Sequence, residues 1–188
     1  MRFNLATTLT LVRIGLIPVL AVCFYLPFAG ARSLCAFIFA VAAFTDWLDG
    51  YLARKLEQTT AFGAFLDPVA DKLMVAITLV LIVQAQPSPW LALAAAVIIG
   101  REITIASLRE WMAEIGQRKQ VEVSWLGKIK TSAQMAAIVV LLLAFDVTAT
   151  WVGASGYVLL YISAALTLWS MINYLRVALP MLISSKKC

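Results

Sequence analysis

Four aspartates stand within strongly apolar stretches of this chain, at Asp46, Asp49, Asp67 and Asp71. An ionised aspartate at the centre of a membrane helix costs roughly 2.5–3.5 kcal/mol on insertion scales. Carboxylates that repel one another in a low dielectric cannot all stay ionised unless other charges compensate them. Two divalent cations would cancel the formal charge of the four carboxylates, and ligation by oxygen alone favours Mg²⁺ or Mn²⁺ over zinc. We therefore predict that these aspartates bind metal.

The spacing of the aspartates places them on two helix faces. Asp46 and Asp49 are three residues apart and Asp67 and Asp71 are four apart, so each pair shares one face of a helix. At ~1.5 Å per residue, Asp49 and Asp67 lie about 6–7 Å from the ends of their helices, and Asp46 and Asp71 about 12 Å. Two antiparallel helices joined by a short loop would bring the two pairs level. A pair of metal ions at that position suits phosphoryl-type displacement, because the ions stabilise both the attacking and the leaving oxygen.

Small and basic residues accompany the aspartates. Gly50 and Gly63 place no side chain beside the carboxylates, which allows a substrate to approach the backbone or two helices to pack closely. Arg54, at the end of the first acidic helix, is placed to hold a phosphate with its fork of donors. Solvation at a helix end is the usual explanation of a single acidic residue, but it does not account for four at matched depths.

The composition predicts a membrane protein. Of the 188 residues, 63% are hydrophobic and 13% are charged, and the mean hydropathy is +0.92. A soluble domain of this length cannot bury that much apolar surface. The absence of histidine excludes a Ser-His-Asp triad, His-ligated zinc and imidazole acid–base chemistry. The three cysteines show neither a disulfide nor a metal-binding pattern.

Six apolar stretches of roughly 20 residues are long enough to cross a bilayer. They are Thr8–Phe28, Arg32–Arg54, Gly63–Gln84, Trp90–Trp111, Trp125–Phe145 and Thr150–Arg176. We therefore expect an all-α, polytopic integral membrane protein with six transmembrane helices in a single domain, residues 1–188. An even number of spans puts both termini on one side, and that side holds all but one of the 15 Lys and Arg residues. This excess predicts cytoplasmic termini, and basic residues at membrane ends do not indicate nucleic-acid binding.

The aspartates belong to a longer pattern, Asp-x2-Asp-Gly-x2-Ala-Arg-x8-Gly-x3-Asp-x3-Asp. The chain matches it at Asp46, Asp49, Gly50, Ala53, Arg54, Gly63, Asp67 and Asp71. This pattern resembles the signature of the CDP-alcohol phosphotransferase family. Leu9-Thr10-x2-Arg13 resembles the first helix of that family. The segments Arg101-Glu102 and Gly127-Lys128-Ile-Lys130-Thr131 are similar to the branch of the family that uses glycerol phosphate.

The resemblance implies an enzyme that transfers a phosphatidyl group from CDP-diacylglycerol to sn-glycerol 3-phosphate and releases CMP. It implies that Asp46, Asp49 and Asp67 hold the metal ions and that Asp71 is both a metal ligand and the general base. It further implies that the CDP moiety is contacted by Gly50, Ala53, Arg54 and Gly63. A homodimer in the cytoplasmic (inner) membrane, with its active site facing the cytosol, completes the expectation.

Glycerol phosphate is a dianion and needs cationic donors. The candidates are Arg101, Arg109, Arg118, Lys128, Lys130 and Arg176. Arg101 is roughly 15 Å from its helix end, level with the aspartates. An arginine at that depth faces either a cavity or an ion-pair partner, and one of the four aspartates is such a partner. The others have a simpler alternative as topology determinants or as side chains that extend to the membrane surface.

Two other kinds of function remain open at this point. The aspartates would also suit the ion pathway of a cation transporter or channel. The outer halves of the spans carry almost no polar groups, which favours a site open to one side only. Within the family, the alternative acceptors are serine, inositol phosphate and phosphatidylglycerol, and the basic residues favour a phosphorylated acceptor over serine.

Overall fold

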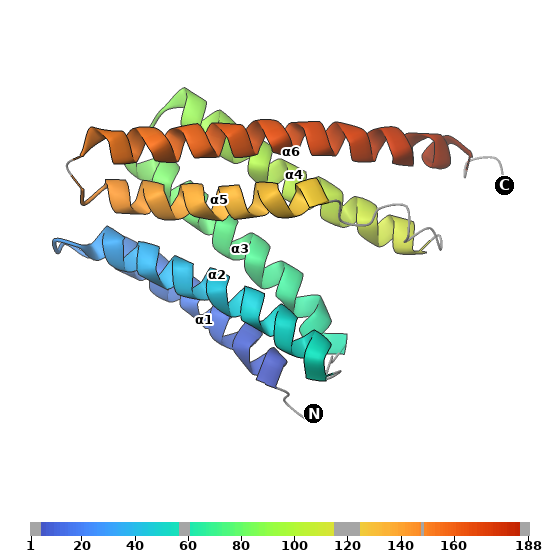
Figure 1. The fold of residues 1–188 in the computed structure, drawn as a ribbon, viewed down its shortest axis with the longest axis horizontal. Coiled ribbons are helices and arrows are strands. Elements are labelled where there is room, and N and C mark those ends of the chain that lie inside the picture. The colour runs from blue at the N-terminus through green and yellow to red at the C-terminus, as the bar shows by residue number, and fades with distance from the viewer. Residues whose placement is uncertain (1–4, 57–60, 115–124, 148, 185–188) are drawn as a thin grey trace.

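The computed structural model describes residues 5–56, 61–114, 125–147 and 149–184, which form a bundle of α-helices with no strand (Figure 1). The helices are α1 (Leu5–Phe24), α2 (Ala31–Leu56), α3 (Ala61–Ala85), α4 (Pro89–Glu114), α5 (Trp125–Ala144) and α6 (Thr150–Ser184). The prediction of an all-α fold is confirmed.

Consecutive helices run in opposite directions. The α1–α2, α3–α4 and α5–α6 connections therefore share one end of the bundle, which we call the loop end (Figure 1). The opposite end, where α1 begins and α6 ends, also holds Asp46, Asp67 and Asp71, and we call it the aspartate end.

Two helix ends lie four or more residues from the sequence expectation, while the others lie within three. α1 ends at Phe24 rather than at Phe28, because Pro27 cannot continue a helix and disfavours the helical conformation of the residue before it. Gly30 then adopts a φ of 90°, a conformation open to glycine, and its carbonyl accepts a 2.9 Å bond from the Leu34 N–H at the start of α2. α6 continues past Arg176 to Ser184.

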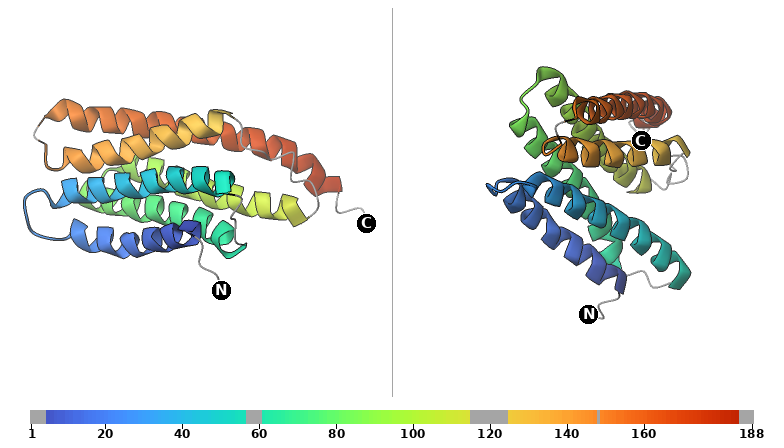
Figure 2. Two further views of the ribbon diagram at one scale, coloured as in Figure 1. Left: turned by 60° about the horizontal axis from the view of Figure 1, so that its bottom comes forward. Right: turned by 60° about the vertical axis from the view of Figure 1, so that its left-hand side comes forward.

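The packing places α1 against both helices of the acidic pattern. α1 contacts α2 and α3, while α5 and α6 form the other extensive pair, joined to the first group through α2 and α4. Figure 2 shows α1 and α2 side by side along their lengths. The core between the helices is apolar, and its most deeply buried side chains include Leu20, Phe39, Leu79, Ile98 and Leu141. α1 is thus held firmly beside the acidic faces of α2 and α3.

The surface of the described residues suits a lipid environment. Pro89–Ala113 and Thr150–Arg176 are long and apolar enough to cross a membrane, and shorter apolar helical segments lie in α1 and α5. At the loop end, Tyr25, Trp90 and Trp151 are 60%, 71% and 74% exposed. Tyrosine and tryptophan are enriched where a membrane meets water.

Candidate active site

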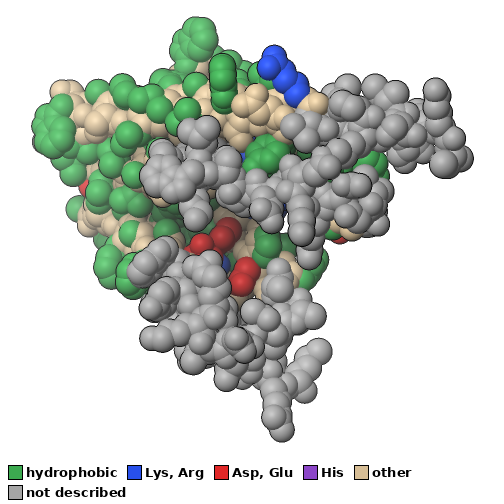
Figure 3. Space-filling view, turned by 45° about the vertical axis from the view of Figure 1, so that its right-hand side comes forward, with side chains coloured by type: hydrophobic (Ala, Val, Ile, Leu, Met, Phe, Trp, Pro, Cys, Tyr) green, Lys and Arg blue, Asp and Glu red, His purple; other side chains and the backbone are tan. Residues whose placement is uncertain are grey.

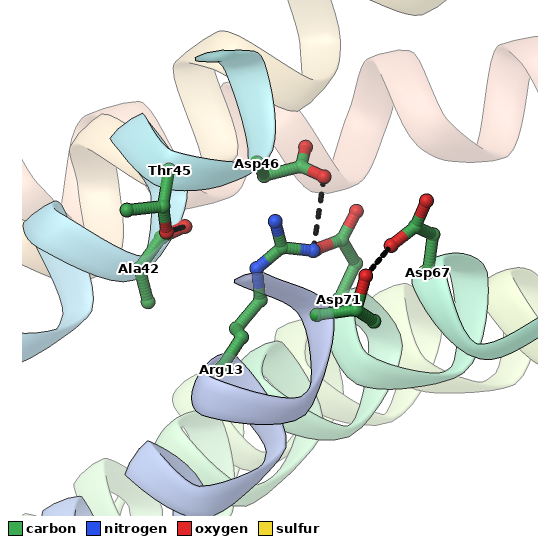
Figure 4. A network of polar contacts seen from close by, with 7 residues as sticks. Arg13, Ala42, Thr45, Asp46, Asp67 and Asp71 are labelled. Carbon is green, nitrogen blue, oxygen red and sulfur yellow. Dashed lines mark hydrogen bonds and ion pairs between the residues drawn. The ribbon is translucent and has the colours of Figure 1, made fainter. Parts of the chain in front are cut away.

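Carboxylates from two helices meet a single arginine at the aspartate end. Asp46 of α2 and Asp71 of α3 point toward Arg13 of α1, and Asp67 lies beside Asp71 (Figure 4). Arg13 Nη1 is 3.0 Å from Asp46 Oδ1 and 2.9 Å from Asp71 Oδ1. Because one nitrogen reaches both carboxylates, Asp46 and Asp71 lie at the same level of the bundle, as their spacing from the helix ends suggested.

The third described carboxylate also receives a donor from α1. The Thr10 hydroxyl donates a hydrogen bond to Asp67 Oδ1. Thr10 and Arg13 are three residues apart and so share one face of α1. That face therefore supplies a donor to each of the three described aspartates of the pattern.

The Arg13 side chain is much more deeply buried than the two aspartates that it contacts. The Arg13 side chain is 1% exposed, whereas those of Asp46 and Asp71 are 39% and 32% exposed. Figure 3, turned so that the aspartate end comes forward, shows acidic atoms at the surface of the molecule. The carboxylates are thus open to an incoming ligand, and the guanidinium lies beneath them.

For several predicted site residues the structure describes the backbone but not the side chain. Asp49, Gly50, Ala53 and Arg54 lie in α2, but their side chains are outside the described residues. Gly63 is buried near the start of α3. Their roles as metal ligand and CDP contacts stay predictions.

Among the candidates for acceptor phosphate, two arginines of α4 face α6. Arg101 is 6% exposed, and its Nη1 lies 2.6 Å from Glu102 Oε1 while its Nη2 lies 3.5 Å from Ser170 Oγ. Its carboxylate partner in the described structure is therefore the adjacent glutamate and not Asp46, Asp67 or Asp71.

The other candidates divide into two groups. The Arg109 guanidinium lies 5.8 Å from the ring centre of Tyr174 in α6, and Arg176 is exposed. The side chains outside the described residues are those of Arg118, Lys128 and Lys130. The α4–α6 contact thus carries two of the six predicted cations.

Sequence reasoning missed the contact of Thr10 and Arg13 with the aspartates. Both residues entered the sequence analysis only through the family pattern, and Arg13 also through the count of basic residues. A signal was available, because the two residues lie about 8 and 12 Å from the start of α1, the depth range of the aspartates. An arginine at that depth in an apolar helix requires a partner.

The described aspartates have the donor chemistry that a divalent cation requires. Asp46, Asp67 and Asp71 supply the carboxylate oxygens that Mg²⁺ and Mn²⁺ prefer, and the recorded bonds from α1 use only Oδ1 of each. Within the described residues no three acidic, His or Cys side chains are arranged so that they could hold a metal ion, and the side chain of Asp49 lies outside those residues. Arg13 supplies the positive charge between two of the three carboxylates.

A cavity of about 470 Å³ at the loop end is formed by a different part of the fold. Its charged groups hold helices together: Arg32 lies 4.5 Å from the ring centre of Phe145, and Asp146 accepts bonds from the Ser33 N–H and hydroxyl. None of the residues of the aspartate pattern lines it. The aspartate end is therefore the candidate active site.

The sequence as a whole matches the profile of the CDP-alcohol phosphatidyltransferase family over residues 3–169. The chain belongs to this family, and the resemblance found in the aspartate pattern is confirmed.

Three similar proteins share the name CDP-diacylglycerol–glycerol-3-phosphate 3-phosphatidyltransferase. The proteins of Salmonella choleraesuis, Pectobacterium atrosepticum and Yersinia pestis are 55%, 56% and 57% identical to this chain. Each match spans 178 residues, which is 95% of this chain and 96% of the relative.

Proposed function

We propose that this protein transfers the phosphatidyl group of CDP-diacylglycerol to sn-glycerol 3-phosphate, giving phosphatidylglycerophosphate and CMP. The observation that carries the proposal is the similarity to relatives named for this transfer, which are 55–57% identical over 95% of the chain. The clustered carboxylates at the aspartate end supply a site of suitable chemistry.

In the proposed reaction, Asp71 accepts the proton of the 1-hydroxyl of glycerol phosphate. The freed oxygen forms a bond to the phosphorus that carries diacylglycerol. The bond between that phosphorus and the CMP oxygen breaks, and its electron pair leaves with CMP. The 32% exposure of Asp71 supports this role, because a base must meet the hydroxyl it deprotonates.

The proposed metal ligands are Asp46, Asp49, Asp67 and Asp71, which would hold two Mg²⁺ or Mn²⁺ ions. When bound, such ions would neutralise the carboxylates and stabilise the attacking and leaving oxygens. The proposed CDP contacts are Gly50, Ala53, Arg54 and Gly63. The proposed acceptor-phosphate contacts are Arg101, Arg109, Arg118, Lys128, Lys130 and Arg176.

We further propose that all six helices cross the cytoplasmic membrane, with both termini and the aspartate end on the cytosolic side. The alternating direction of the helices and the basic residues near the aspartate end support this arrangement. A lipid donor with a nucleotide head group suits a site that lies a short way below the membrane surface. The homodimer is proposed from the family resemblance alone.

A defined acceptor panel tests the proposal. Purified protein in lipid vesicles receives CDP-diacylglycerol with glycerol phosphate, serine, inositol phosphate or phosphatidylglycerol, and the lipid product is identified by mass spectrometry. We expect phosphatidylglycerophosphate and stoichiometric CMP with glycerol phosphate. Preferential turnover of another acceptor would contradict the assignment, and cation flux without CMP release would indicate a transporter.

Metal removal tests the proposed cofactor separately. Excess EDTA is expected to abolish CMP release, and added Mg²⁺ or Mn²⁺ is expected to restore it. Full activity in excess chelator would refute the metal assignment while leaving the acceptor result intact.

A further inference from the structure

The first helix contributes no acidic residue to the aspartate pattern, yet it contacts all three aspartates whose side chains are described. Arg13 Nη1 joins Asp46 Oδ1 at 3.0 Å to Asp71 Oδ1 at 2.9 Å, and the Thr10 hydroxyl donates to Asp67 Oδ1. In each carboxylate these bonds use the same oxygen, Oδ1. These bonds do not involve the other oxygen, Oδ2.

The burial of Arg13 is costly as a device for stability alone. A buried ion pair loses much of its Coulomb gain to desolvation and is weak evidence for stabilisation. Arg13 is 1% exposed, and its Nε and Nη2 have no hydrogen-bond partner among the described residues. A residue kept in such a position needs a role beyond holding helices together.

Carboxylates that bind metal ions are themselves commonly hydrogen-bonded by neighbouring residues, which fix their orientation. We infer that Thr10 and Arg13 are positioning residues, which hold Asp46, Asp67 and Asp71 by one oxygen each so that the other oxygen is presented to a divalent cation. This inference rests on the metal site of the proposed function. It assigns a task to α1, which carries none of the predicted metal ligands.

The main alternative is that Arg13 is a substitute cation that leaves when metal arrives. The two ideas predict opposite effects of removing the guanidinium. A positioning residue strengthens metal binding, so its loss weakens that binding. A competing cation weakens metal binding, so its loss strengthens it.

The experiment measures Mn²⁺ binding to the purified full-length protein in detergent, using the electron paramagnetic resonance signal of free Mn²⁺ and no lipid substrate. We expect Arg13→Gln to raise the Mn²⁺ dissociation constant roughly 10–100-fold, the usual loss for a residue that orients a metal ligand. We expect Thr10→Val to raise it by a smaller factor and Thr10→Ser, which keeps the hydroxyl, to restore it.

Matched controls lie elsewhere in the bundle. Thr78→Val removes a buried hydroxyl of α3 that donates to the Met74 carbonyl, and Arg32→Gln removes a cation at the loop end. Neither change should alter Mn²⁺ affinity. The melting temperature without metal is measured for every variant, because a purely structural role would lower that temperature and leave the affinity of the folded protein unchanged.

Unchanged or tighter Mn²⁺ binding in folded Arg13→Gln would overturn the inference for Arg13. If that variant does not fold, Thr10→Val tests the inference for the face of α1 that Thr10 and Arg13 share. Wild-type Mn²⁺ affinity in Thr10→Val would then refute the inference. The acceptor panel is an independent test, since an unexpected lipid product with intact Mn²⁺ binding would contradict the proposed function alone. Failure of the wild-type protein to bind Mn²⁺ would remove both the metal site and this inference.

Discussion

At the scale of single residues, the Asp71 side chain is partly exposed and is also held by a contact with Arg13. Its side chain is 32% exposed, and its Oδ1 lies 2.9 Å from the Arg13 guanidinium. Attachment through one oxygen fixes the plane of the carboxylate, while its exposure allows a substrate hydroxyl to approach. Both properties suit a general base that must act in one orientation.

Replacement of Asp71 by asparagine should abolish most turnover, because the amide cannot accept the proton of the attacking hydroxyl. General-base catalysis contributes roughly 10²–10⁴-fold, so a rate loss of at least that size is expected in CMP release. The protein should still elute as a single folded species, because Asp46 remains as a partner of Arg13. Asp146→Asn, at the loop end, is the control and should retain activity. A wild-type rate for Asp71→Asn would exclude this residue as the base.

Arg101 offers a second test at the residue scale. Arg101→Ala should raise the KM for glycerol phosphate more than the KM for CDP-diacylglycerol, because a cation that binds the acceptor acts on one substrate only. Steady-state kinetics with each substrate varied in turn measures both values.

The Glu102→Gln variant distinguishes an acceptor-binding role of Arg101 from a structural role. It weakens the 2.6 Å ion pair with Arg101 but keeps the guanidinium in place. If the glutamine variant reproduces the kinetics of Arg101→Ala, or if both KM values rise equally, Arg101 has a structural role instead.

The site residues that could be predicted from sequence are those whose position carries a free-energy cost that can be recognised without a structure. Aspartates in apolar helices are expensive wherever the helices pack, so their spacing alone indicated a shared site. The partner of Arg101 could not be predicted, because several carboxylates were within reach and only packing selects Glu102. The contact between Arg13 and the aspartates required knowing that α1 lies against both α2 and α3.

At the scale of helices, α5 and α6 are tightly packed at a glycine, Gly156. A Cβ atom added to Gly156 would lie 2.9 Å from the Leu141 side chain and 3.2 Å from the Leu141 backbone nitrogen. At Gly153, one turn earlier, the nearest atom would be Ala144 Cβ at an ordinary 3.8 Å. The two glycines therefore lie in the same helix but differ in the space available for a side chain.

Gly156→Ala should destabilise the protein, because overpacking against Leu141 costs about 1–3 kcal/mol. Gly153→Ala is the matched control and should be neutral or slightly stabilising, since alanine favours a helix over glycine by up to about 1 kcal/mol. Melting temperatures of both purified variants provide the measurement. Equal melting temperatures would mean that α5 and α6 are not in close contact at Gly156.

Helices were easier to predict than their ends. Each of the six apolar stretches became a helix, although α1 and α3 contain Pro18 and Pro68, because a helix pairs its backbone groups within the segment itself. The end of α1 moved from Phe28 to Phe24 because Pro27 acts on the residues before it. α6 runs to Ser184 because the residues that follow Arg176 are again mostly apolar, and one arginine does not end a helix.

At the scale of the whole molecule, the proposed orientation has a direct test. Thr150 begins α6 at the loop end and is exposed, whereas Cys188 follows α6 in the sequence. In proteins that carry a single cysteine, a membrane-impermeant maleimide added to spheroplasts should label Thr150→Cys at once. Cys188 should react only after the membrane is permeabilised. The reverse pattern would invert the proposed topology.

The exposed aromatic residues at the loop end have a consequence for the membranes in which the protein works. If Tyr25, Trp90 and Trp151 anchor that end at one interface, the length of α3 fixes how far the carboxylates reach toward the other. Asp71 lies about 21 Å along the helix from Ala85, which leaves it about 9 Å short of the far side of a ~30 Å hydrocarbon layer. The depth of the carboxylates would then depend on the thickness of the bilayer. A thinner bilayer would expose the carboxylates to water, and a thicker one would bury them below the level that the nucleotide reaches.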